Sequence, residues 1–302
     1  MSAHTRPTLV VVGASGYLGR RVALLARPHY RVLATYHSLP QPHSHPRPGD
    51  EVRALDVRDR AAVEACISDA APSVVINCAY VQQGPDVEAI TATAPGMLAS
   101  AAQRAGARFV HLSSDVVFPG RSDRPYREDD DPAPVHDYGR AKRRAEQLVM
   151  AAHRAPLIIR TSLIYRGRAD NGGADEGPQE RMVRGALGGD DVWFFTDEIR
   201  NPIEVDVLAS AILELAAGGH HGLLHVAGAD AIDRFTFAQL LATAMDADAS
   251  VLRGRPRDTM AAPRPGNLAL DCTKARAILR DTVLTGAREA LSRRGRRSDR
   301  GL

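Results

Sequence analysis

The sequence contains few cysteines, few aromatic residues and no long apolar stretch. Its 3 cysteines, Cys66, Cys78 and Cys272, lie far apart and lack metal-ligand spacing. This pattern indicates thiols in a reducing compartment and excludes a disulfide-stapled scaffold. No run reaches the roughly 18 apolar residues of a membrane span, and the opening "MSAHTRPT" has no signal-peptide core. We therefore expect a cytoplasmic protein with no metal site and no membrane partner.

The charge of the chain is also close to balanced. The formal net charge is +3 for 302 residues, and several basic residues lie in the last ten positions. A nearly neutral folded part argues against nucleic acid as the main partner. Residues 291–302 are predicted to form a basic, disordered tail.

Short apolar runs alternate with helix-like segments through the first half of the chain. Strands are expected at 9–12, 32–34, 74–76, 109–112 and 157–159, and helices near 17–26, 59–70, 86–105 and 138–153. The alternation predicts an α/β fold of Rossmann type, a doubly wound parallel sheet with a small C-terminal substrate lobe. The predicted domains are an NAD(P)-binding domain over 1–162 and a mostly substrate-binding lobe over 163–290, with a return to the first domain near 198–218.

A glycine-rich turn follows the first expected strand. In "VVGASGYLGRRV" the spacing is G-x-x-G-x-x-G, one residue wider than the commonest dinucleotide fingerprint. Such glycines allow a tight turn that brings a pyrophosphate to the N-terminus of the next helix, although they also serve plain strand–helix packing. The predicted cofactor contacts here are Gly13, Ser15, Gly16, Tyr17, Leu18 and Gly19.

The end of the second expected strand carries no acid. Tyr36, His37 and Ser38 stand where a carboxylate would hold the ribose hydroxyls of NAD. Without that carboxylate, and with basic residues nearby, the sequence favours NADP(H) over NAD(H). Asp56, followed by Val57, either borders the adenine pocket or caps the next helix.

Two further segments carry residues suited to proton transfer. "VHDYGRAK" places Tyr138 and Lys142 four residues apart on one helical face. "FVHLSSDVVF" is a strand that ends near Ser114, and strand carboxyl ends line the ligand crevice of an open α/β sheet. A structural tyrosine beside a solvated lysine is the alternative.

These motifs resemble the extended branch of the short-chain dehydrogenase/reductase superfamily, and within it the group typified by dTDP-4-dehydrorhamnose reductase. The resembling segments are "SSDVVFPG", "PYREDDDPAP", "YGRAK", "IIRTSLIY", "DEIRNPIEVDVLA" and "RPGNLALDCTKA". The resemblance implies an NAD(P)H-dependent reductase of a nucleotide-linked 4-keto-6-deoxy sugar. It implies that Ser114 orients the substrate oxygen, Tyr138 transfers the proton, and Lys142 holds the nicotinamide ribose and lowers the pKa of the tyrosine.

Further residues are expected around both ligands, the cofactor neighbours from the resemblance and the arginines from their chemistry. The implied cofactor neighbours are Cys78, Ala79 and Tyr80. The candidate substrate contacts are Ser114, Asp115, Val116, Arg200, Asn201 and Arg264. A guanidinium group matches diphosphate geometry, but either arginine could instead form a structural salt bridge. "DEIRNP" and "NCAYVQQGPDVEA" depart from the pattern of the group, so a different keto-sugar remains open.

Two other functions stay open on the sequence. The chain is similar to the NADP-binding regulatory β subunit of methionine adenosyltransferase at "SSDVVF", "PYRED", "DPAP" and "RPGNLALDC". A sugar-nucleotide epimerase is the other alternative. The expected partner is a nucleotide-sugar, and a homodimer is possible.

Overall fold

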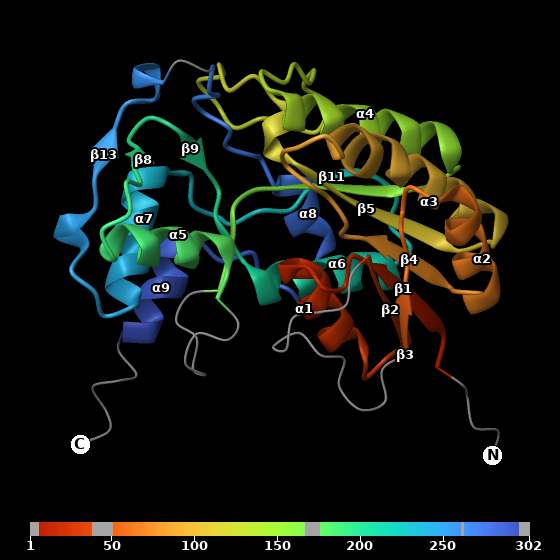
Figure 1. Ribbon diagram of the computed structural model, residues 1–302. Coiled ribbons are helices and arrows are strands. Elements are labelled where there is room, and N and C mark those ends of the chain that lie inside the picture. Colours follow the sequence, from red (N-terminus) through yellow and green to blue (C-terminus); the bar gives the residue numbers. More distant parts are fainter. Residues whose placement is uncertain (1–5, 38–50, 167–175, 261–262, 296–302) are drawn as a thin grey trace, which may run out of the picture. The chain divides into compact units, whose positions relative to one another are not determined.

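Strand β1 (Thr8–Val12) lies inside a seven-stranded sheet because its apolar, mostly β-branched residues are buried on both faces. The strand order is β11-β6-β5-β4-β1-β2-β3 (Figure 1). In the computed structural model β1 pairs in parallel with β2 (Arg31–Tyr36) and β4 (Val74–Asn77). Val12 is in register with Thr35 and Asn77, so the three carboxyl ends meet at one edge.

The remaining strands of this sheet are β3 (Glu51–Ala54), β5 (Arg108–Ser114), β6 (Leu157–Thr161) and β11 (Gly222–His225). Its helices are α1 (Tyr17–Ala26), α2 (Arg60–Ala70), α3 (Ala94–Arg104), α4 (Asp137–Ala152) and α6 (Val205–Ala217). Figure 1 shows α2, α3 and α4 over one face of the sheet and α1 and α6 over the other. The predicted α/β class with a doubly wound parallel sheet is therefore confirmed.

The structure describes residues 6–37, 51–166, 176–260 and 263–295, and the chain divides into two compact units. Unit 1 comprises Met1–Ser114, Asp137–Ile159 and Ala209–Leu224. Unit 2 comprises Asp115–His136, Arg160–Leu208 and His225–Leu302. Within the described ranges, no helix combines the length and apolar character needed to cross a bilayer. Ser38 lies outside the described residues.

Three features of the sheet and its helices differ from the sequence expectation. β3 and β11 were not expected, because both are short edge strands and β3 has largely exposed, charged residues. The helix expected at 86–105 divides into a π-helical segment, η2 (Val87–Thr93), and α3. Pro95 explains the division, because it has no N–H to donate to the carbonyl four residues earlier.

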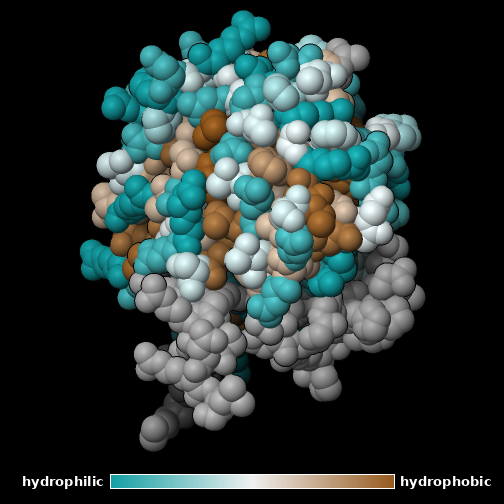
Figure 2. Space-filling model, turned by 90° about the vertical axis from the view of Figure 1, so that its left-hand side faces the viewer, coloured by the Kyte–Doolittle hydropathy of each residue, from teal (hydrophilic) through white to brown (hydrophobic). Residues whose placement is uncertain are grey.

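Unit 2 has its own core around Tyr165, Phe194 and Phe237. Its strands are β7 (Ile164–Tyr165), β8 (Phe194–Phe195), β9 (Ile199–Arg200), β10 (Ile203–Glu204), β12 (Ile232–Asp233) and β13 (Gly254–Arg255). Its helices include α5 (Pro178–Leu187), α7 (Arg234–Ala244), α8 (Thr273–Ile278) and α9 (Ala287–Gly295). Figure 2 shows the face that carries α5, α7 and β13, where hydrophobic residues form small groups within a hydrophilic surface.

Candidate active site

The glycine turn joins β1 to α1 and has no room for side chains at two of its positions. Gly13 has a φ of +78°, and a Cβ there would lie 2.8 Å from the backbone of Ala79. A Cβ on Gly19 would lie 2.3 Å from the Gly13 carbonyl oxygen. Helix α1 begins after Gly16, with no side-chain cap at its N-terminus. The turn therefore brings backbone close to the start of a helix, which suits a pyrophosphate.

The carboxyl ends of β2 and β3 carry a cluster of charges. Arg58 lies 2.8 Å from one oxygen of Asp56 and 2.9 Å from Asp86, and it hydrogen-bonds the His37 ring at 3.3 Å. The hydrogen bond from Arg58 is the main cause that lowers the pKa of Asp56 to about 2. The N-cap of α2 is Asp59, so the capping role weighed for Asp56 is wrong. Asp56 cannot cap because the chain still turns for three residues before the helix starts.

Lys142 and Tyr138 lie on the first turns of α4, against the end of β5. The ammonium of Lys142 donates a hydrogen bond to the Leu112 carbonyl at 2.8 Å. It also lies 5.1 Å from the centre of the Tyr80 ring and 5.8 Å from that of Tyr138. The two tyrosine rings are 5.9 Å apart. Unit 1 thus brings together three residues that the sequence assigned to cofactor and catalysis.

The environment of Lys142 changes its proton affinity. The side chain is buried, with 3% of the residue exposed. Burial lowers the pKa of Lys142 to about 8. An amine with a pKa near neutrality can respond to charge changes nearby, as functional lysines do.

The end of β4 supplies a buried polar pair beneath this site. Asn77 donates to the His111 ring at 3.2 Å and accepts from the Ala79 N–H at 3.1 Å. Burial lowers the pKa of His111 well below its ordinary value and raises that of Cys78 to about 12. Both side chains are thus neutral near pH 7. They therefore lie beside the site without adding a charge to it.

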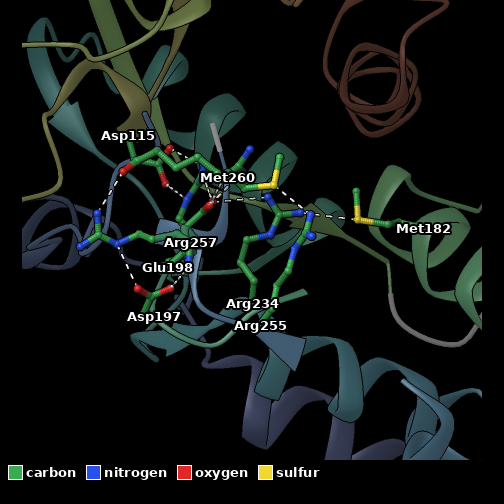
Figure 3. A network of polar contacts seen from close by, with 10 residues as sticks. Asp115, Met182, Asp197, Glu198, Arg234, Arg255, Arg257 and Met260 are labelled. Carbon is green, nitrogen blue, oxygen red and sulfur yellow. Dashed lines mark hydrogen bonds and ion pairs between the residues drawn. The ribbon is translucent and has the colours of Figure 1, made fainter. Parts of the chain in front are cut away.

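Unit 2 holds most of the predicted substrate contacts, and Figure 3 shows part of their ion-pair network. Arg200 donates two hydrogen bonds of 2.7 Å to Asp115 and one of 3.1 Å to Glu198. Glu198 also forms ion pairs with Arg234 and Arg264. Burial alone would raise the pKa of Glu198, but the three guanidinium groups outweigh it and keep the pKa below its ordinary value.

Several of these residues are buried supports. All three nitrogens of Arg200 donate to carboxylates, so the structure favours the salt-bridge alternative over a direct grip on diphosphate. Asn201 is 4% exposed and bonds the backbone of Gly228 and Leu270. Val116 is also buried. Arg264 donates two hydrogen bonds to Glu198, but 31% of its side chain is exposed.

Unit 2 carries an arginine–aromatic face that was not predicted from the sequence. β13 pairs in parallel with β8, with Arg255 opposite Phe195. The Arg253 guanidinium lies 4.6 Å from the Trp193 ring centre, and that of Arg255 lies 5.3 Å from Trp193 and 5.8 Å from Phe195. Arg253 also pairs with Asp191, whereas no ion pair of Arg255 occurs within the described ranges. The alternating arginines of "RGRPR" were the available signal.

A parallel sheet with a glycine turn after its first strand and a Tyr-x-x-x-Lys pair beside β5 defines the class, an extended short-chain dehydrogenase/reductase. The chain belongs to the RmlD substrate binding domain family, whose pattern matches residues 7–294.

Known proteins of this type are similar along most of their length. The chain is 34% identical to dTDP-4-dehydrorhamnose reductase of Mycolicibacterium smegmatis, over 94% of this chain and 83% of that protein. It is 31% identical to a probable low-salt glycan biosynthesis reductase, Agl14, of Haloferax volcanii, over 89% of this chain and 91% of that protein. The fold matches a crystal structure of dTDP-4-dehydrorhamnose reductase from Bacillus anthracis in complex with NADP, with a TM-score of 0.78, 23% identity, and 97% and 100% of the chains covered.

The chain is also similar to a protein of another class. It is 29% identical to methionine adenosyltransferase 2 subunit beta of Xenopus laevis, over 93% of this chain and 86% of that protein.

Proposed function

We propose that the protein is an NAD(P)H-dependent reductase that acts on the ketone of a nucleotide-linked 4-keto-6-deoxy sugar. The observation that carries the proposal is the pair Tyr138 and Lys142 beside the carboxyl end of β5, in a chain 34% identical to a dTDP-4-dehydrorhamnose reductase. Bound nicotinamide cofactor supplies the hydride that the carbonyl carbon receives. The residues of the protein must bind and orient the substrate and donate a proton to it.

The protein's part is to place a proton donor at the ketone oxygen. That oxygen gains negative charge in the transition state, so a donor aimed at it lowers the barrier. We assign the proton to the Tyr138 hydroxyl and a supporting hydrogen bond to Ser114, the last residue of β5. The Lys142 ammonium stabilises the phenolate that remains after the proton has moved.

We assign the cofactor contacts to unit 1. The glycine turn is too tight for Cβ atoms at Gly13 and Gly19, which supports a close backbone approach to a pyrophosphate at the start of α1. We propose NADP(H) as the preferred cofactor. The negative charge of Asp56 is already balanced by Arg58, and the His37 side chain is 63% exposed next to them.

On the substrate side we assign direct contacts to partly exposed arginines of unit 2. Arg264 is one, because 31% of its side chain is exposed. Arg255 is the other, because its guanidinium stacks on aromatic rings without an ion pair in the described part of the chain. A diphosphate matches such guanidinium groups. We assign Arg200 and Asn201 a supporting role.

The test is turnover of nucleotide-linked 4-keto-6-deoxy sugars with NADPH and with NADH, in the wild type and in Tyr138→Phe. The wild type should consume the reduced cofactor and form the alcohol, and Tyr138→Phe should do so about 100-fold more slowly. If the wild type reduces none of these sugars, the proposal fails. Binding of NADPH together with capture of a partner protein would then favour a regulatory subunit, which the 29% identity to methionine adenosyltransferase 2 subunit beta supports as second candidate.

A further inference from the structure

Helix α4 buries a carboxylate that the proposed reaction does not use. Glu146 lies one turn beyond Lys142 on the same helix and is 1% exposed. Ser113, the neighbour of Ser114 on β5, donates a hydrogen bond of 2.6 Å to it. Arg143 lies 3.3 Å from its other oxygen. A buried carboxylate costs free energy unless it is paired, and Ser113 and Arg143 pair this one.

Residues four apart on a helix are neighbours, so Glu146 places a negative charge near the buried ammonium of Lys142. Several other groups also face Lys142: the thiol of Cys78, the ring of His111, the rings of Tyr80 and Tyr138, and the Leu112 carbonyl. Burial keeps Cys78 and His111 neutral near pH 7. Among the described residues, Cys78 and Glu146 raise the pKa of Lys142, and of these two Glu146 is the carboxylate.

Glu146 acts on the site in two ways. It accepts the hydrogen bond of Ser113 at the end of β5, and its charge acts on Lys142 one helical turn away. We propose that Glu146 is a positioning residue that keeps Lys142 protonated and holds the end of β5, next to Ser114, against α4. The inference rests on the proposed function for its effect on catalysis, but its effect on Lys142 is independent of any substrate.

The composition of the chain makes Lys142 directly observable. The sequence contains two lysines, Lys142 and Lys274, so protein labelled with 13C at lysine Cε has two side-chain NMR signals. Lys274→Arg assigns them. A pH titration of the full chain then reports the pKa of Lys142 without substrate or turnover. Lys274 pairs with Glu128 in unit 2 and serves as the internal reference.

Glu146→Gln is the decisive variant, because it removes the charge and keeps an oxygen that can accept from Ser113. We expect the midpoint of Lys142 to fall by about 1 pH unit, the lower end of the effect of a nearby opposite charge. Glu146→Asp, which keeps the charge, should stay nearer the wild type. Ser113→Ala, which removes the hydrogen bond alone, should leave the midpoint unchanged.

Glu64→Gln is the matched control. Glu64 lies on α2 and pairs with Arg104 at 2.8 Å, but its side chain is 44% exposed. The Lys142 midpoint should stay at its wild-type value in this variant. If Glu146→Gln leaves the midpoint unchanged, or if Glu64→Gln lowers it equally, the inference is wrong.

The pH profile of turnover connects the inference to catalysis. With a midpoint near 8 in the wild type, Glu146→Gln should lose about fivefold more activity than the wild type does between pH 6 and pH 8. A variant that is merely less stable would lose activity at all pH values. If the wild type reduces no keto-sugar, the proposed function fails, while the NMR titration still decides the role of Glu146.

Discussion

Replacement of Arg200 by methionine should destabilise the protein far more than replacement of an exposed arginine. Arg200 is 6% exposed, and its three bonds hold Asp115 and Glu198, two carboxylates with no solvent exposure. Methionine fills much of the same space but leaves Asp115 without a counter-charge from this position. The Glu198 carboxylate still has Arg234 and Arg264 as ion-pair partners in this variant. The cost should therefore arise mainly at Asp115.

The expected size follows from the burial of the pair. Removal of one partner of a buried ion pair costs about 3–5 kcal/mol of unfolding free energy. In a chain of this size that lowers the melting temperature by about 5–8 °C. Arg253→Met is the control, because its ion pair with Asp191 is exposed. This control substitution should lower the free energy of unfolding by no more than about 1 kcal/mol.

Urea unfolding of the two variants, followed by circular dichroism, measures these differences. A double variant, Arg200→Met with Asp115→Asn, isolates the cause. The neutral amide needs no counter-charge, so the second change should restore about 2 kcal/mol to the Arg200 variant. The reasoning is refuted if Arg200→Met lies within 1 kcal/mol of the wild type, or if Asp115→Asn lowers its stability further.

Four other outcomes are expected. Tyr138→Phe should bind NADPH normally but turn over about 100-fold more slowly, because only the proton donor is lost; wild-type turnover would show that another group gives the proton. Activity should fall as the pH rises through about 8, since Lys142 is needed in its charged form and its pKa is about 8; a flat profile from pH 6 to 10 would contradict this. His37→Asp should shift the preference from NADPH toward NADH in calorimetric titrations, because a carboxylate repels the 2′-phosphate. Arg255→Gln should weaken binding of the free nucleoside diphosphate about tenfold, which calorimetry of that ligand would detect.

The α/β class was predictable because local signals repeat along the chain. Buried strands such as β1 and β4 are short apolar runs, and each is followed by a helical pattern. β3 and β11 were not predicted, because a strand at the edge of a sheet need not be apolar on both faces. Asp56 could not be placed for a related reason: the contact with Arg58 is local, but His37 meets Asp56 only after β2 and β3 pair.

The reactive pair was also predictable, because Tyr138 and Lys142 are close in sequence and lie on one helix face. The neighbours that set the properties of Lys142 were not predictable. Ser113 meets Glu146 across 33 positions, and Cys78 and Tyr80 reach the lysine from the segment that follows β4. Such contacts depend on how α4 packs on the sheet, which no local pattern encodes.

The sequence by itself thus determined the fold class, the glycine turn and the Tyr-x-x-x-Lys pair, because each is set by spacing within one or two elements. Only the tertiary structure decided which charges are paired. From the sequence alone Arg200 is a candidate contact for a diphosphate, whereas in the structure Asp115, 85 positions away, accepts both of its 2.7 Å bonds. The physical reason is that desolvation and pairing depend on atoms brought together from distant parts of the chain.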